Sequence, residues 1–98
     1  MIYELVTVDV IPGKVKEFHD WWLKESLAFF EEHGIKIIGS WMTMIGKSNE
    51  VIRLLAYDDL AHVERCRQSF SESQKGLELS RNIWNYAAHI ERKILSPC

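Results

Sequence analysis

Residues 39–58 read GSWMTMIGKSNEVIRLLAYD, two apolar runs separated by a short polar segment. Gly46 and Asn49 lie in that segment, and both residue types favour the backbone conformations of tight turns. The flanking runs contain the β-branched and aromatic residues that favour strands. The stretch therefore predicts a β-hairpin with antiparallel arms at 35–44 and 51–57, and a sheet at the centre of the fold.

A strand and a long helix are predicted before the hairpin. Residues 2–11 are rich in β-branched side chains and are followed by Pro12-Gly13, a pair that cannot continue a strand. Residues 14–33 carry large apolar side chains three or four positions apart, which is typical of an amphipathic helix. Gly34 follows them, and glycine commonly ends helices because it adopts the left-handed conformation without strain.

Two helical segments and a last strand are predicted after the hairpin. Asp58 and Asp59 are good N-cap residues for a helix at 60–70, and a capping-box pattern at 71–74 restarts the helix. Residues 87–95 alternate in the manner of a strand. The order β-α-β-β-α-β predicts one α+β domain over residues 1–98, with the ferredoxin-like arrangement of a four-stranded antiparallel sheet and helices on one face.

The second face of this sheet also receives large apolar residues, such as Trp41 or Met42 depending on the register. A chain of 98 residues with 47% hydrophobic content builds a real but thin core. Packing the open face against a second copy is the economical way to bury it. We therefore expect a homodimer in which two sheets pack face to face.

Composition argues against several functions. Because 12 basic and 14 acidic residues give a net charge of -2, no electrostatic footprint for nucleic acid is present. No apolar run approaches the roughly 20 residues that span a bilayer, so we expect no membrane insertion and a cytoplasmic location. Cys66 and Cys98 are expected to be free thiols. His62 and Cys66 could supply two metal ligands, but a structural zinc site normally has four. A lone histidine is weak evidence for haem. We therefore expect no metal and no cofactor.

Several short motifs follow one another along most of the chain. They are Ile2-Tyr3-Glu4-Leu5, Pro12-Gly13-Lys14, His33-Gly34-Ile35-Lys36, Gly39-Ser40-Trp41, Asn49-Glu50-Val51 and Ala56-Tyr57-Asp58. In this order and spacing they resemble the NIPSNAP family. The resemblance implies a dimeric α/β barrel made of two ferredoxin-like sheets. It places the chain in a wider superfamily that includes cofactor-independent monooxygenases, small-molecule isomerases and haem-handling enzymes, and this fold-level analogy sets a prior for function and no more.

A candidate site lies between the first helix and the sheet. The helix residues expected on its inner face are His19, Trp22 and Ser26. The sheet residues expected opposite them are Glu4, Trp41, Arg53, Tyr57 and His89. An apolar cleft with a few polar groups suits a small apolar or aromatic ligand. Histidine side chains can take up and release a proton near neutral pH, so we expect His19 to act as the base, with Arg53 or Tyr57 stabilising an enolate or a phenolate.

Arg53 has a structural interpretation as well as a functional one. It lies mid-strand between Ile52 and Leu54, and a buried guanidinium needs a partner. Glu4 and Glu50 are the candidates by strand position. An ion pair or a dimer contact is the expected use of Arg53, with binding of a substrate carboxylate as the alternative.

Three functions are compatible with these residues. The first is cofactor-independent monooxygenase or isomerase chemistry in the pocket. The second is a non-catalytic binding or scaffold module, whose aromatic residues serve the dimer and whose pocket is filled by its own side chains. The site residues then have structural roles: His19 bonds to a neighbour, and Trp22 and Trp41 are core. The third is contact with another protein through Trp21, which lies off the apolar stripe of the helix. A cavity of about 300 Å³ or more beside His19 and Trp22 would favour the first, because that is the lower end of typical ligand pockets.

Overall fold

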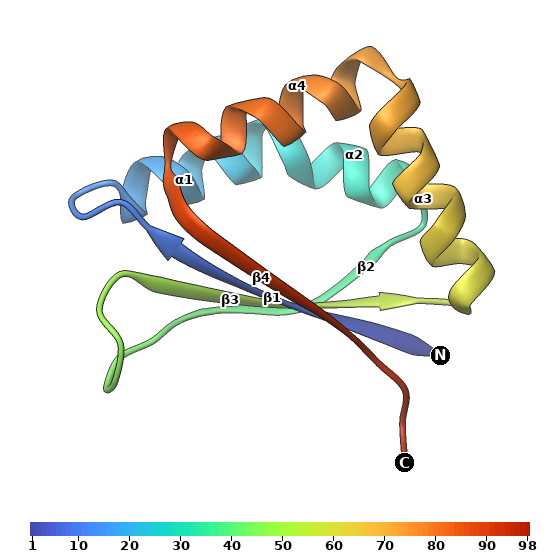
Figure 1. Ribbon diagram of the computed structural model, residues 1–98, viewed down its shortest axis with the longest axis horizontal. Coiled ribbons are helices and arrows are strands. Elements are labelled where there is room, and N and C mark those ends of the chain that lie inside the picture. Colours follow the sequence, from blue (N-terminus) through green and yellow to red (C-terminus); the bar gives the residue numbers. More distant parts are fainter.

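The computed structural model describes residues 1–98 and has all of its helices on one face of a four-stranded sheet (Figure 1). The strands are β1 Ile2–Val10, β2 Lys36–Met42, β3 Glu50–Tyr57 and β4 Ala87–Leu95. Their order in the sheet is β2-β3-β1-β4, and every neighbouring pair is antiparallel. The predicted α+β ferredoxin-like fold is therefore confirmed, with strand ends within about two residues of the expected ones.

The long helix predicted after the first strand is present as a continuous helical run. It consists of α1 Val15–Trp21, the π-helical segment η1 Trp22–Ser26 and α2 Leu27–Glu32. Phe18, Trp22 and Ser26 are buried on its inner side, as their spacing predicted. Gly34 follows with a φ of 72°, the left-handed conformation expected at the end of the helix.

The helices after the hairpin begin at residues that cap them. In α3 Leu60–Glu72 the side chain of Asp59 accepts the backbone N–H of His62 at 2.8 Å. In α4 Gln74–Asn82 the Ser73 hydroxyl accepts the N–H of Gly76 at 3.0 Å. The short 3-10 turn η2 Ile83–Asn85 leads into β4. None of these helices has the length and hydrophobicity that a membrane span requires.

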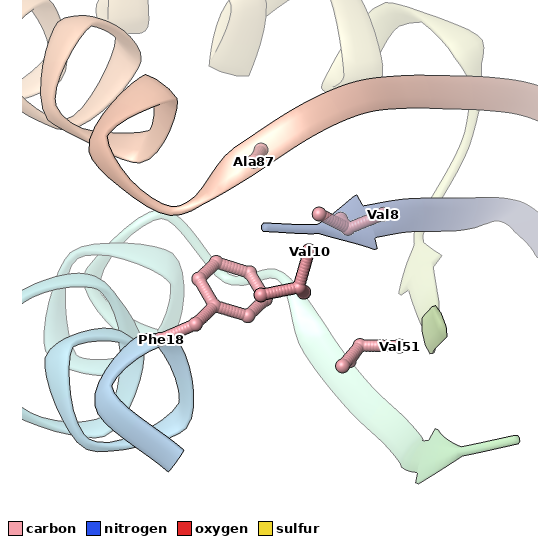
Figure 2. Close-up of a cluster of buried hydrophobic side chains, with 5 residues drawn as sticks. All are labelled: Val8, Val10, Phe18, Val51 and Ala87. Carbon is pink, nitrogen blue, oxygen red and sulfur yellow. The ribbon is translucent and has the colours of Figure 1, made fainter. Parts of the chain in front are cut away.

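The core lies between the helices and the sheet because the strands alternate their side chains between two faces. One buried cluster contains Val8, Val10, Phe18, Val51 and Ala87. Figure 2 shows the Phe18 ring reaching from α1 toward Val10. A second buried cluster contains Ile35, Leu55, Tyr57, Val63 and Cys66. Both clusters fill the helix-covered side of the sheet.

The other face of the sheet has no helix over it (Figure 1). The register places Leu5 opposite Leu54 and Trp41 opposite Ile52 on this open face. A Cβ on Gly39 would overlap the Trp41 ring, so the indole lies directly over the glycine. The side chain of Trp41 is 54% exposed there. Trp41 therefore belongs to the open face, which resolves the question that its register left open.

Candidate functional site

A cavity of about 430 Å³ lies between the helices and the sheet, and Trp22 is part of its wall. Its volume is above the roughly 300 Å³ at the lower end of ligand pockets. Hydrophobic residues make up 13 of its 19 lining residues, so its walls suit an apolar ligand. The aromatic residues of the wall are Trp21, Trp22, Phe30, Tyr57, Phe70 and Trp84. Its ionisable residues other than Tyr57 and Cys66 are Glu4, Arg53, Arg67 and Arg92.

Arg53 is the buried cation of this cavity. It alternates with Val51 and Leu55 along β3, so it faces the helices, and it is only 3% exposed. Its Cζ lies 4.0 Å from the centre of the Trp22 ring and 4.9 Å from the centre of the Phe18 ring. Both distances are within the range of cation–π attraction. The aromatic rings of the helix therefore hold the guanidinium against the sheet.

No carboxylate pairs with Arg53. The ion pairs of the structure involve other residues, and Arg53 Nε and Nη2 are buried without a hydrogen-bond partner. The expected ion pair with Glu4 or Glu50 is therefore wrong. Glu50 instead accepts a hydrogen bond from the hydroxyl of Thr43 at 2.6 Å. Burial lowers the pKa of the Arg53 guanidinium to about 10, which leaves it positively charged at neutral pH.

Glu4 and Tyr57 form a buried pair on the same wall. The Tyr57 hydroxyl donates to Glu4 Oε1 at 2.8 Å, and the two residues are 4% and 6% exposed. Burial, and then the nearby charge of Glu4, raise the pKa of the Tyr57 phenol. The phenol therefore stays protonated and serves as a donor that fixes one oxygen of the carboxylate.

The structure brings together five of the residues that the sequence suggested for the site. Glu4, Trp22, Ser26, Arg53 and Tyr57 all line the cavity. They come from β1, the π-helical segment and β3. The arrangement combines one carboxylate, one cation and an apolar volume, which is enough to bind a small molecule and to accept a proton from it.

The expectation that His19 faces the sheet is wrong. His19 is exposed and does not line the cavity. It follows the buried Phe18, and one residue turns a helix by about 100°, which carries the imidazole to the solvent side. His19 is therefore not a candidate base in this cavity.

Trp41 and His89 also lie outside the cavity. Trp41 is on the open face of the sheet, as described above. His89 is exposed and pairs across the strands with Asp9, and its Nε2 lies 3.3 Å from Glu91 Oε1. Neither side chain can reach a ligand bound between the helices and the sheet.

Two arginines of the cavity were not singled out from the sequence. Arg92 pairs across the strands with Val6, and Arg67 is four residues after the buried Val63 on α3. A charged residue on the apolar side of a strand, between Ile90 and Ile94, was the available signal for Arg92. Both arginines are exposed, so they lie where the cavity meets solvent.

Trp21 packs against two other aromatic rings. Its ring centre lies 6.2 Å from that of Phe18 and 5.4 Å from that of Tyr86. It is half-buried and lines the cavity. The structure therefore gives Trp21 a role in the wall of the site.

His62 has a structural role beside the cavity. Its Nδ1 accepts the backbone N–H of Asp58 at 3.0 Å, and its Nε2 lies 2.7 Å from the carbonyl of His33. Because that partner is a carbonyl, Nε2 carries the proton and donates. The ring thus ties the start of α3 to the end of α2, and both of its nitrogens are used.

Comparison with known proteins adds a family to this geometry. A family model described as NIPSNAP matches residues 3–98. The chain is similar to the crystal structure of an uncharacterised NIPSNAP domain protein from Burkholderia xenovorans, with 28% identity, a TM-score of 0.89, and coverage of 100% of this chain and 95% of that chain. An uncharacterised NIPSNAP-like domain protein from the same organism gives 30% identity, a TM-score of 0.86, and coverage of 99% and 84%.

A more distant structure shares only the fold. It is a putative antibiotic biosynthesis monooxygenase from Nitrosomonas europaea, with 12% identity, a TM-score of 0.75, and coverage of 99% of this chain and 98% of that chain. Similarity at this level of identity supports the architecture and says nothing of the reaction. No curated protein matches the chain.

Proposed function

The chain belongs to the NIPSNAP family, as its motifs suggested, and we propose that it binds a small enolisable or phenolic compound in its cavity and moves a proton on it without a cofactor. One observation carries this proposal. A buried, unpaired cation, Arg53, shares the wall of an apolar cavity with the hydrogen-bonded Glu4. Cations without partners in protein interiors are costly, and such sites are common where a ligand supplies the partner.

The residues divide the chemistry between them. Glu4 accepts a proton from the ligand. When the proton leaves the carbon beside a carbonyl group, the electron pair of the C–H bond forms a C=C bond and the negative charge moves onto the carbonyl oxygen. When it leaves a phenolic hydroxyl, the pair stays on that oxygen. Arg53 stabilises the enolate or phenolate oxygen that results. Return of the proton to a different carbon gives an isomerase. Reaction of the same anion with molecular oxygen as co-reactant gives a monooxygenase: a CH₂ or ring CH group of the ligand is oxidised, one oxygen atom enters the ligand and the other leaves as water.

Glu4→Gln should slow proton transfer at least tenfold, because the amide cannot accept the proton and positioned acid–base groups contribute about 100-fold or more. The assay follows exchange of the methylene protons of phenylpyruvate, and of its methyl ester, in D₂O by ¹H NMR. Glu64→Gln, at an exposed position on α3, is the matched control. Equal exchange by wild type and Glu4→Gln would remove Glu4 from the reaction. Wild type without exchange on either probe would favour a non-catalytic binding module.

We further propose that the open face of the sheet joins two copies of the chain. Leu5, Ile52 and Leu54 are half-buried on this face, and Trp41 beside them is 54% exposed. Contiguous apolar surface of this kind marks an interface, and a two-fold arrangement allows the same patch to meet itself. The alternative function, a scaffold that acts through protein contacts, would use this face as well.

Leu54→Lys should weaken the dimer at least tenfold, because two lysine charges would be buried at the interface. Sedimentation at micromolar concentration should give twice the chain mass of 11.5 kDa for wild type and a shift toward 11.5 kDa for the variant. Ala61→Lys, on the exposed side of α3, should remain dimeric. Wild type that sediments only as the 11.5 kDa species would contradict the dimer.

A further inference from the structure

We propose that the ligand of the cavity is an apolar carboxylic acid, bound with its carboxylate on Arg53 and its body against the aromatic wall. This inference rests on the proposed function, because it names the class of compound that the same cavity takes. It is carried by three features of the cavity: the hydrogen bonds that Arg53 lacks, the charge of the lining, and the apolar character of the remaining wall.

The first feature is the unused donors of Arg53. A guanidinium presents its N–H groups in a planar fork that matches the two oxygens of a carboxylate. Arg53 Nε and Nη2 have no partner in the protein, and the residue is 3% exposed. The only acidic residue of the cavity wall, Glu4, is bonded to Tyr57 and forms no ion pair. A ligand carboxylate would accept hydrogen bonds from Nε and Nη2. Nη1 then remains for the enolate or phenolate oxygen of the proposed function, because a guanidinium has five N–H donors.

The second feature is the charge of the lining. Three arginines line the cavity, Arg53, Arg67 and Arg92, against the single carboxylate of Glu4. The whole chain has a net charge of -2, so the cavity is positive within an acidic protein. The two outer arginines are exposed and lie where a ligand enters. A cleft lined by one sign of charge concentrates ligands of the opposite sign.

The third feature limits the ligand to a single small acidic group. Only one of the three arginines is buried, so only one is shielded from water and able to bind an anion strongly. The buried wall around it is aromatic and aliphatic, including Trp22, Val8 and Leu55. A phosphate carries more charge and more acceptors than this wall can satisfy. An apolar acid with one carboxylate fits this cavity, because the carboxylate binds Arg53 and the apolar body contacts the aromatic and aliphatic side chains.

The test compares acids with their neutral amides. Binding of benzoate, 1-naphthoate and octanoate, each beside its amide, is measured by calorimetry at neutral pH. Wild type should bind at least one acid tenfold or more tightly than its amide, and Arg53→Met should bind the two equally. Arg53→Lys should keep part of the preference, because it keeps the charge and loses the fork. Arg65→Met, at an exposed position on α3 outside the cavity, should keep all of it.

The stability of the variant separates loss of a ligand contact from loss of the fold. Unliganded Arg53→Met should melt at or above the temperature of wild type, because methionine fills the space between Phe18 and Trp22 without an unpaired charge. Equal affinity of wild type for acid and amide would overturn the inference and leave the proposed function standing. Tighter binding of the acid than of the amide, without any proton exchange, would support the inference and overturn the proposed function. Wild type that binds no probe would overturn the inference, and with no exchange it would overturn the proposed function too.

Discussion

Gly76→Ala is expected to lower the free energy of unfolding by about 2 kcal/mol, although helix propensity alone favours alanine by about 1 kcal/mol. Gly76 is buried in the first turn of α4. A Cβ at this position would lie 2.5 Å from the carbonyl oxygen and 2.6 Å from the Cα of Phe70. These are backbone atoms of α3, so they cannot rotate away. The steric cost of overpacking, typically 1–3 kcal/mol and larger for rigid neighbours, therefore exceeds the gain in propensity.

Urea denaturation and thermal melting measure this effect, and for a domain of this size 2 kcal/mol corresponds to roughly 10 °C in Tm. Gly13→Ala is the matched control, because its φ is 86° and a Cβ there would meet nothing within 4 Å. It should cost about 1 kcal/mol, from backbone conformation alone. A Gly76→Ala variant more stable than wild type would show that the corner between α3 and α4 can open freely.

The corner also shapes the site. Phe70, at the end of α3, and Leu79, on α4, both line the cavity. A change in the angle between the two helices would move both side chains relative to Arg53. We therefore expect Gly76→Ala to weaken ligand binding as well as folding, which a substitution far from the cavity would not do.

The fold could be predicted from the sequence because its signals are local. The turn residues at 46–49 fix the hairpin, and the polar residues at 58–59 and 71–74 mark the starts of α3 and α4, where the structure has Asp59 and Ser73 as the caps. Glu4 and Arg53 could be assigned to the site because strand alternation places each of them among apolar neighbours on one face. None of these inferences needs information about the packing of distant segments.

His19 could not be placed in the same way, because the helix has two flanks beside its apolar stripe. Trp21 lies on one flank and His19 on the other, since they differ from Phe18 by about −60° and +100° at 100° per residue. The flank of Trp21 is covered, through contact with Tyr86 near the start of β4. Only the packing of this distant segment decides which flank is buried. The residues of the helix alone do not show that Tyr86 packs on the Trp21 side.

The faces of Trp41 and His89 depend on irregularities in the strands. The pairing of β2 with β3 shifts between Ile37 and Gly39, and that of β1 with β4 shifts between Asp9 and Val10. A shift of one residue moves every later side chain to the opposite face. Counting alternate residues from the start of β2 or β4 therefore assigns Trp41 and His89 to the helix-covered face. Because of the shifts, both lie on the open face.

Phe18→Ala should have the largest effect, a loss of about 4 kcal/mol in the free energy of unfolding, within the range of 3–5 kcal/mol typical of this substitution in a core. Phe18 is 0% exposed and packs in the cluster with Val8, Val10, Val51 and Ala87 (Figure 2). A domain of this length is stable by roughly 5–15 kcal/mol, so the variant should lose about a quarter to four-fifths of its stability. Phe18→Leu keeps most of the volume and should cost about 1 kcal/mol in urea denaturation. Losses of equal size in both variants would contradict a role for the ring volume.

A double-mutant cycle between Phe18→Ala and Arg53→Met separates the packing of Phe18 from its contact with the cation. The ring centre lies 4.9 Å from Arg53 Cζ, and a desolvated cation–π contact contributes about 1–2 kcal/mol. If the ring stabilises the charge, Phe18→Ala should cost about 1 kcal/mol less in the Arg53→Met background than in wild type. Loss of the ring also lets water reach the guanidinium. This lowers the desolvation cost of Arg53 in the Phe18→Ala variant and makes the measured coupling smaller. A coupling of zero would contradict a net stabilisation of the charge by the ring. A coupling of opposite sign would mean that Phe18 keeps Arg53 dry at a net cost to stability.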